Sequence, residues 1–251
     1  KTTTVLNLGA ALSDLGYKVL LVDLDPQADL SAGLGVVVDI EEPPAAISLY
    51  SVLASENGSI DSLIVPAGYK DLSLVPGTLD MADLELQLAP QMGRERVLQA
   101  ALASVAGRFD FVLLDCPPSL GLITLNALVA ADGVLIPVQA EPRSIRATRR
   151  MLAAVGLVQR KLVRPDLRVL GLLLTMTGAN KIAREAEALL RTTYGQNVLM
   201  ATVRRRVVVS EDTVYQAPVL SYAPRSQTAA DFRALASEMI TRIEEKERAH
   251  A

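Results

Sequence analysis

The hydrophobic residues of this chain fall into two alternating patterns. One is a short apolar run and the other is a longer stretch with an apolar residue every three or four positions. The short runs predict strands and the longer period predicts helices. The expected strands cover residues 19–25, 72–76, 109–115, 133–138, 169–176 and 198–203. The expected helices cover residues 2–15, 80–106, 120–131, 144–162, 181–194 and 226–247, with one short helix near 48–54 in a less regular region, 36–71.

Several of the expected strands are hydrophobic almost throughout, such as LLV at 20–22 and FVLL at 111–114. Such strands are typical of sheets covered by helices on both faces. Because strands and helices alternate, the sequence predicts an α/β fold with a doubly wound, mostly parallel sheet and helices on both faces. We find no linker and expect one domain over residues 1–251. Ligands of such folds bind beyond the carboxyl ends of the strands, where candidate residues should be sought.

The composition excludes several classes of protein. Half of the 251 residues are hydrophobic, which suffices for a substantial core. Cys116 is the one cysteine, so an intramolecular disulfide and a cluster site that needs two cysteines per chain are excluded. No apolar run approaches the roughly 18 residues of a membrane span. We therefore expect a cytoplasmic protein without a membrane partner.

Charge is distributed unevenly along the chain, although the net charge is only −3. Residues 1–140 hold 6 Lys and Arg against 17 Asp and Glu, whereas residues 141–210 hold 14 against 4. Residues 211–251 hold 5 against 7. The basic block is consistent either with a surface for a polyanion or with ordinary solvated helix faces.

Three short motifs carry candidate chemistry. The chain opens with KTTT at the start of a helical pattern, and a phosphate-binding loop ends in Lys-Thr at that place. In LLVDLDPQ the acids Asp23 and Asp25 follow a strand, where either could also serve a turn or cap. In FDFVLLDCPPS a strand delivers Asp115 to the sheet edge, where it could bind magnesium or cap the next helix.

The order and spacing of these motifs resemble the ParA/Soj ATPases, deviant Walker-type members of the P-loop class that also includes MinD. The resemblance runs nearly from end to end. It rests on KTTT, VLLVDLDPQADLSAGLG, FDFVLLDCPPSLGLITLNAL, GVLIPVQAE, LLLTM and SYAPRSQTAADFRALASE. It implies a P-loop NTPase type of fold that binds ATP and Mg²⁺.

The resemblance also implies roles for individual residues. Lys1 is expected on the outer phosphates, and Thr2 and Asp115 are expected to hold Mg²⁺. Asp25 is expected to orient the attacking water, so Asp25 and Lys1 are the catalytic candidates. The other residues expected at the nucleotide are Thr3 at the phosphates, Asp23 near the metal, Met176 against the adenine and Arg205 near the base.

The function that the resemblance implies is the partitioning of plasmids or chromosomes. ATP would close a homodimer that binds DNA without sequence preference, and a ParB-type partner would stimulate a slow hydrolysis. Such a protein would be associated with the nucleoid. The alternatives are a MinD-like positioning ATPase, whose amphipathic C-terminal anchor is not matched by the charged ITRIEEKERAHA, and a catalytically dead DNA-binding or scaffold relative.

The sequence departs from the family pattern in three places. The strand and glycines of the P-loop would precede Lys1, so we expect the chain to begin inside its P-loop and to have impaired ATP hydrolysis. The family's Pro-Arg-Asn is replaced by Arg204, Arg205 and Arg206. The arginines that hold DNA in close relatives align with Asn180 and Val208. Other candidates for DNA are Lys181, Arg184, Arg204, Arg205 and Arg206, or the helix with Arg143, Arg146, Arg149 and Arg150.

Overall fold

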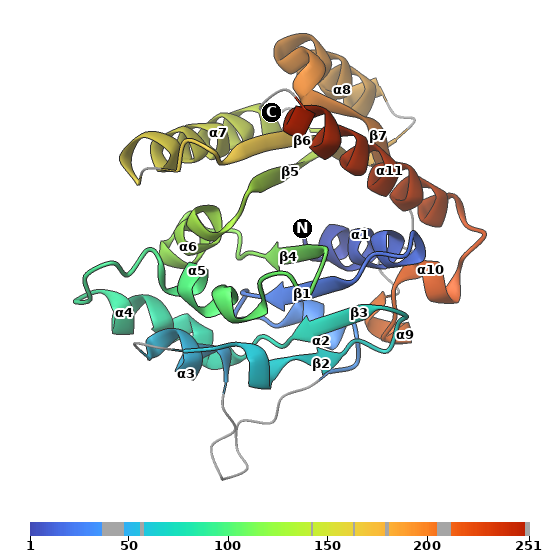
Figure 1. Cartoon of the computed structure of the whole chain (residues 1–251). Helices are drawn as coiled ribbons and strands as arrows, with labels where there is room; N and C mark the ends of the chain where they lie inside the picture. Colours follow the sequence, from blue (N-terminus) through green and yellow to red (C-terminus); the bar gives the residue numbers. More distant parts are fainter. Residues whose placement is uncertain are drawn as a thin grey trace. The chain divides into compact units, whose positions relative to one another are not determined.

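The computed structural model of the chain describes residues 1–36, 48–55, 58–141, 143–162, 164–178, 181–204 and 212–248. The chain forms two compact units (Figure 1). The first unit consists of Lys1–Ala131 and Glu211–Tyr222, and the second of Asp132–Ser210 and Ala223–Ala251. The expectation of one domain over the whole chain stays a prediction.

The first unit is built on a four-stranded sheet with the strand order β2-β3-β1-β4. Its elements are α1 (Thr2–Asp14), β1 (Val19–Asp23), α2 (Asp29–Ala32), α3 (Leu49–Ala54), η1 (Asp61–Leu63), β2 (Val65–Pro66), β3 (Leu72–Val75), η2 (Leu79–Asp83), α4 (Leu84–Leu88), α5 (Val97–Leu102), η3 (Ala103–Val105), β4 (Phe111–Asp115), α6 (Leu122–Ala130), α9 (Asp212–Tyr215) and α10 (Val219–Tyr222). β1 is parallel to β3 and β4, and the short β2 is antiparallel to β3. The register of β1 and β4 places Asp23 opposite Asp115, so these two acids reach the same edge of the sheet.

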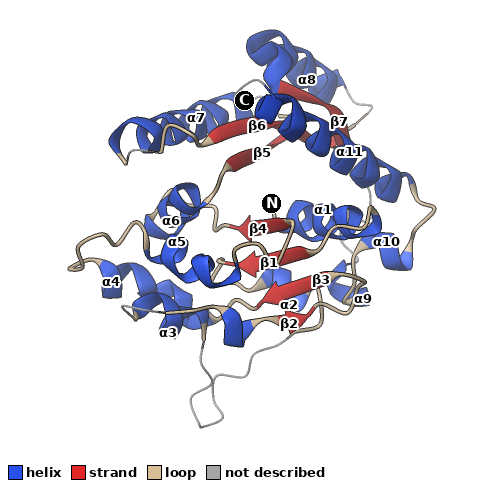
Figure 2. Ribbon diagram, in the orientation of Figure 1, coloured by secondary structure: helices blue, strands red, loops and turns tan. Residues whose placement is uncertain are grey.

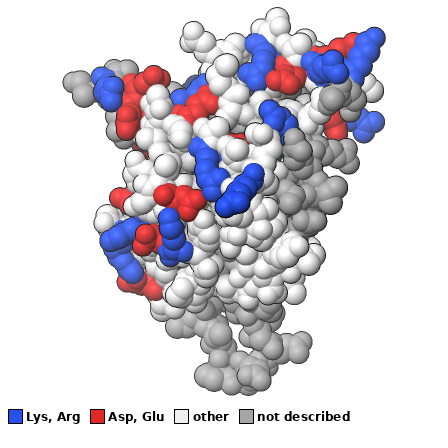
Figure 3. Space-filling model, turned by 90° about the vertical axis from the view of Figure 1, so that its right-hand side faces the viewer, with Lys and Arg blue, Asp and Glu red and all other residues white. Residues whose placement is uncertain are grey.

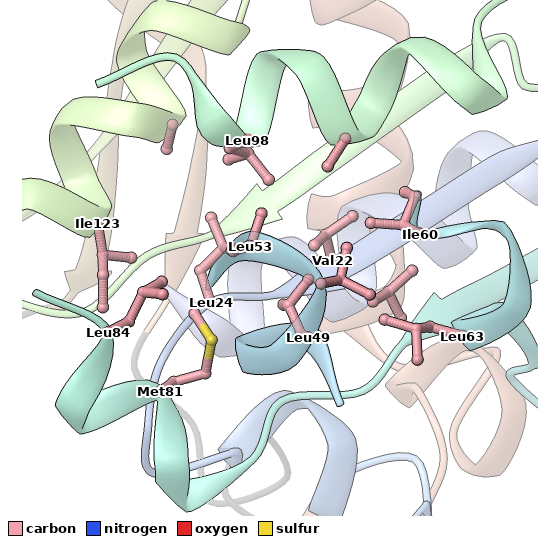
Figure 4. Packing of buried hydrophobic residues seen from close by; sticks show 14 of the residues in the cluster. Val22, Leu24, Leu49, Leu53, Ile60, Leu63, Met81, Leu84, Leu98 and Ile123 are labelled. Atoms are coloured by element: carbon pink, nitrogen blue, oxygen red, sulfur yellow. The ribbon is translucent and has the colours of Figure 1, made fainter. Parts of the chain in front are cut away.

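Strand β1 is buried along its whole length because helices cover both of its faces. On one face Gly9 of α1 lies so close to Leu21 that an added Cβ atom would be 2.7 Å from Leu21 Cδ2. On the other face Leu20 and Val22 belong to a hydrophobic cluster with residues of α3 to α6. Figure 4 shows this cluster, in which Val22 lies among side chains from several helices. The apolar run therefore has the two-sided burial that its sequence predicts.

The segment with α9 and α10 is fastened to α1 although some 200 positions separate them in sequence. The Val219 backbone N–H donates to Asn7 Oδ1 at 2.7 Å, and this bond is buried. The Asn7 amide group also donates to the Thr3 carbonyl at 3.0 Å. Gln216 packs against Gly35, whose φ of +70° is a backbone conformation that favours glycine. Asn7 thus joins the start of α10 to the first turns of α1.

The prediction of one helix over residues 80–106 is wrong. The structure has η2 and α4, then a turn, then α5 and η3. Pro90 cannot donate to a helix and clashes with the preceding turn, and Gly93 adopts a φ of +71°. Asn126 of α6 fixes this turn, since its amide group donates to the Arg94 carbonyl at 2.8 Å. The apolar period continues through the turn because both short helices pack on the same core.

The second unit holds a three-stranded parallel sheet with the strand order β5-β6-β7. Its elements are β5 (Gly133–Gln139), α7 (Ser144–Lys161), β6 (Arg168–Thr177), α8 (Lys181–Tyr194), η4 (Gly195–Asn197), β7 (Val198–Arg204) and α11 (Gln227–Arg248). The pairing of β6 with β7 shifts in register between Leu172 and Leu174. At this shift the Glu238 carboxylate of α11 accepts hydrogen bonds from Met200 N and Ala201 N at 2.9 and 2.7 Å. A side chain therefore takes the place of a neighbouring strand.

The architecture confirms the predicted α/β class with mostly parallel strands and helices on both sides. All six predicted strands are present, and β2 is an additional one. Edge strand β4 is less buried than an inner strand, with Val112 37% exposed. No described helix combines the length and the apolar character that crossing a bilayer requires.

Candidate functional site

The first unit brings together the residues of the three motifs at one edge of its sheet. α1 begins beside the carboxyl end of β4, since the Lys1 ammonium donates to the Pro117 carbonyl at 2.7 Å. The backbone N–H groups of Thr4 and Val5 donate to the Lys1 carbonyl and close the first turn. The N–H groups of Thr2 and Thr3 precede these donors, so α1 cannot satisfy them itself. Together with the helix dipole they make this end of α1 suitable for an anion.

Asp115 is the most unusual residue of the site. Its side chain is 1% exposed, and neither of its carboxylate oxygens has a hydrogen-bond partner among the described residues. Burial raises the pKa of Asp115 to about 6. The Thr2 hydroxyl opposes this rise in pKa, although its approach does not meet the geometry of a hydrogen bond. A buried carboxylate without partners is costly in free energy, and these two oxygens are suited to bind a cation.

The Asp23 carboxylate accepts its hydrogen bonds from other groups of the protein. It is fully buried, and Oδ2 accepts hydrogen bonds from Ser31 N at 2.9 Å and Ser31 Oγ at 2.7 Å. Oδ1 accepts a third from Asp25 N at 3.3 Å. Burial raises the pKa of Asp23, and the bonds from Ser31 oppose that rise. These bonds turn the chain after β1, so the strand ends at Asp23 rather than at Asp25 as predicted.

The sequence analysis did not identify Ser31 and Gly77, which complete the Asp23 network. Gly77 N donates to Ser31 Oγ at 3.0 Å. A Cβ atom on Gly77 would lie 2.8 Å from Asp23 Cγ, so the close approach requires glycine. The sequence offers no periodic signal for this contact, because Ser31 lies in the four-residue helix α2 and Gly77 lies outside any helix or strand. Only the pairing of β1 with β3 brings them together.

Asp25 lies half-buried just beyond this network. Its Oδ1 accepts a hydrogen bond from Gln27 N at 3.0 Å, which is an Asx turn. Oδ2 has no partner among the described residues. The backbone of Asp25 is fixed through its N–H bond to Asp23. Asp25 is therefore held in place while one carboxylate oxygen stays available to a ligand or a water.

The donor atoms at this edge fit Mg²⁺ together with a phosphate group. Asp115 offers a carboxylate and Thr2 a hydroxyl, and both are the hard oxygen ligands that Mg²⁺ prefers. Among the described residues no group of three or more His, Cys, Asp and Glu side chains forms a metal cage. Mg²⁺ in nucleotide sites is commonly held by one or two protein oxygens plus substrate phosphates and waters, so no such cage is needed.

Cys116 follows Asp115 directly but has the properties of a packing residue. It contacts the hydrophobic cluster of the first unit, and its Sγ lies 3.9 Å from the Leu114 carbonyl. Burial and the neighbouring Asp115 raise the pKa of the Cys116 thiol to about 12. The thiolate is therefore negligible near neutral pH, which argues against a nucleophile.

The other residues expected at the nucleotide and at DNA belong to the second unit or lie outside the described residues. Met176 is 48% exposed and has a φ of +52° at a register shift of β6. Lys181 forms an ion pair with Glu185 at 3.8 Å, and Arg204 forms one with Asp231 at 3.8 Å. Arg184 also has an interaction within the protein. Arg205, Arg206, Asn180 and Val208 lie outside the described residues.

Comparisons with known proteins agree with the geometry of this edge. A family model described as an AAA domain matches residues 1–169. The sporulation initiation inhibitor protein Soj of Bacillus subtilis is 37% identical over 241 residues, which cover 95% of this chain and 92% of that protein. The chromosome-partitioning ATPase Soj of Thermus thermophilus is 39% identical, with 98% and 92% covered. The crystal structure of cobyrinic acid a,c-diamide synthase from Mycobacterium smegmatis, with bound ADP and magnesium, is similar with a TM-score of 0.78 at 34% identity, with 94% and 86% covered.

Proposed function

Since the chain belongs to the ParA/Soj family of P-loop ATPases, we propose that it is an ATPase of DNA partitioning that uses ATP and Mg²⁺. The observation that carries the proposal is Asp115, buried at the carboxyl end of β4 with both oxygens unpartnered beside the start of α1. Such a carboxylate is accounted for by a cation. The similar structures with bound nucleotide and magnesium support the same pair of ligands.

Each residue at this edge has a task in the proposed activity. Thr2 and Asp115 hold Mg²⁺, which neutralises phosphate charge when bound. Lys1 and the first N–H groups of α1 bind the phosphates, and Thr3 adds a contact there. Asp25 orients the attacking water through its available oxygen. Asp23 holds Asp25 in position through the hydrogen bond to its backbone N–H.

Two further residues are proposed at the nucleotide because the resemblance to the family implies them. Met176 is proposed to pack against the adenine, and Arg205 to lie near the base. The exposed side chain of Met176 and its positive φ are consistent with a contact outside its own strand.

The proposal extends to partners and location. ATP would promote a homodimer that binds DNA without sequence preference, and a ParB-type protein would stimulate hydrolysis. The substrate of partitioning would be a plasmid or chromosome, and the protein would be cytoplasmic and associated with the nucleoid. The relatives named as chromosome-partitioning proteins support this extension.

Substitution of Asp25 tests the chemistry. Asp25→Ala is expected to lower kcat for ATP hydrolysis by roughly 100-fold or more while MgATP affinity changes little, because Asp25 positions water rather than phosphate. The matched control is Asp29→Ala, which removes an exposed carboxylate four residues away. Hydrolysis rates and calorimetric titrations of both variants separate the two effects. Normal turnover by Asp25→Ala would remove Asp25 from the proposed mechanism.

A further inference from the structure

Helix α7 of the second unit has an unusual distribution of charge. Its 18 residues contain five Lys and Arg and no Asp or Glu, and Arg143 lies at its N-cap. The other long helices of this unit, α8 and α11, contain residues of both signs. Six of the 14 Lys and Arg between residues 141 and 210 therefore lie in α7 or at its N-cap, where no acid accompanies them.

The arginines of α7 lie on the face that points away from the core. The buried residues of the helix are Thr148, Val155 and Val158. Arg143, Arg146 and Arg150 follow the i, i+3, i+7 spacing, and 3.6 residues per turn place them on the opposite side. All three are exposed. We call them the α7 arginine face.

None of these arginines is neutralised within the described part of the chain. No carboxylate of the described residues forms an ion pair with Arg143, Arg146 or Arg150. Other cations of the same unit do have such partners, for example Arg191 with Glu187 at 3.0 Å and Arg242 with Glu238 at 3.2 Å. Figure 3 shows a face of the molecule on which Lys and Arg lie beside Asp and Glu in most groups. The α7 arginine face differs from this mixed pattern.

The position of the arginines along the helix also works against the stability of α7. The N-terminal end of a helix carries a partial positive charge and favours acids. The first turn of α7 contains none, and the arginine face lies in the first half of the helix. Arg143 also makes no capping hydrogen bond with its side chain. These arginines neither stabilise their helix nor pair within the described residues, so their guanidinium groups are available to an external anion.

We propose that the α7 arginine face binds the phosphate backbone of DNA. This inference rests on the proposed function, because it takes DNA as the partner, and it assigns the contact to residues that the family's DNA-binding positions do not include. Three guanidinium groups spread over about 10 Å of helix match the repeated charge of a DNA strand. An anionic membrane is a poorer fit, because the outward face offers no bulky aromatic side chain for insertion.

The test compares two triple variants of the full-length protein that remove equal charge from the second unit. One is Arg143→Gln, Arg146→Gln and Arg150→Gln. The matched control is Arg164→Gln, Arg191→Gln and Arg248→Gln, each of which forms an ion pair with a carboxylate of the same unit. Binding to a random-sequence DNA duplex is measured with MgATP over a range of salt concentrations. Thermal unfolding checks that each variant folds, and Arg150→Gln alone serves if the triple variant does not.

The α7 variant is expected to lose roughly eightfold in affinity per phosphate contact at about 0.1 M salt, with a salt slope smaller by about 0.9 per contact. The control variant is expected to keep the wild-type slope. A charge-preserving variant with lysine at the three α7 positions should keep most of the wild-type salt slope, because the slope depends on the number of positive charges at the DNA.

Three outcomes would overturn the inference. If the α7 variant keeps the wild-type slope, or if the control variant carries the loss, α7 is not the contact and the proposed function stands. If the wild-type protein does not bind DNA with MgATP, the DNA part of the proposed function fails as well. If the wild type binds vesicles of phosphatidylglycerol and phosphatidylcholine through these arginines in place of DNA, the partner is a membrane.

Discussion

At the scale of the residue, the buried Asp115 predicts a pH dependence of stability. In protein kept free of metal with EDTA, its pKa of about 6 exceeds the ordinary value of 3.8. The folded state then binds more protons than the unfolded state between these pH values, so this group lowers the free energy of unfolding as pH rises. The loss reaches at most about 3 kcal/mol above pH 6.

Asp115→Asn removes this titration. The free energy of unfolding of the variant minus that of the wild type should therefore grow between pH 4 and pH 7, as measured by urea unfolding at each pH. Asp83→Asn, which changes an exposed carboxylate, should show no such growth. If the difference in free energy of unfolding between Asp115→Asn and wild type did not change with pH, the pKa of Asp115 would not be raised in the metal-free protein. The same variant should lose Mg²⁺-dependent hydrolysis.

At the scale of the element, the irregular part of β7 at the register shift is stabilised by hydrogen bonds to side chains, and Glu238 accepts two of them. Glu238 accepts from two successive N–H groups, and its side chain is only 18% exposed. Glu238→Ala is expected to lower the free energy of unfolding by about 2 kcal/mol, because hydrogen bonds to a charged group are worth about 1.5–3 kcal/mol each and some solvent replaces them. Amide exchange of Met200 and Ala201 should accelerate at the same time, as hydrogen-exchange measurements would detect.

Glu244→Ala on the same helix is the control for this prediction. Its carboxylate forms an exposed ion pair with Arg248, and such pairs contribute about 0–1 kcal/mol. Exchange at Met200 and Ala201 should be unaffected there. If Glu238→Ala left exchange at these two amides unchanged, another group would be protecting the edge of β7.

Elements could be predicted where local pattern and packing agree. The apolar run of β1 and the period of α8 gave their bounds within two residues. The pattern failed over residues 80–106, where Pro90 and Gly93 break the backbone while the apolar period continues. It also missed β2, which has only two residues and exists through its pairing with β3.

At the scale of the whole molecule, the site contains residues that the sequence could indicate and others that it could not. The motifs with Thr2, Asp25 and Asp115 are local, and their order along the chain was enough to predict a shared edge. The hydrogen bond from Gly77 N to Ser31 Oγ and the close approach of Gly77 to Asp23 depend on the pairing of β1 with β3, which no short motif encodes. The ion pair between Arg204 and Asp231 joins residues that are distant in sequence, so no short motif predicts it either.

The bond between Asn7 and Val219 has a consequence for the gene. The acidic and hydroxyl residues of the proposed site all lie at or before Asp115, in the first half of the 251 residues. The unit that holds them nevertheless also includes α10, about 100 residues later, whose Val219 N–H donates to Asn7 of α1. A nonsense mutation at any codon from 116 to 219 would leave these residues translated, yet it would remove the Val219 N–H from which Asn7 Oδ1 accepts a buried hydrogen bond and leave that oxygen unpaired. Late truncating alleles should therefore behave as null alleles rather than as partial ones.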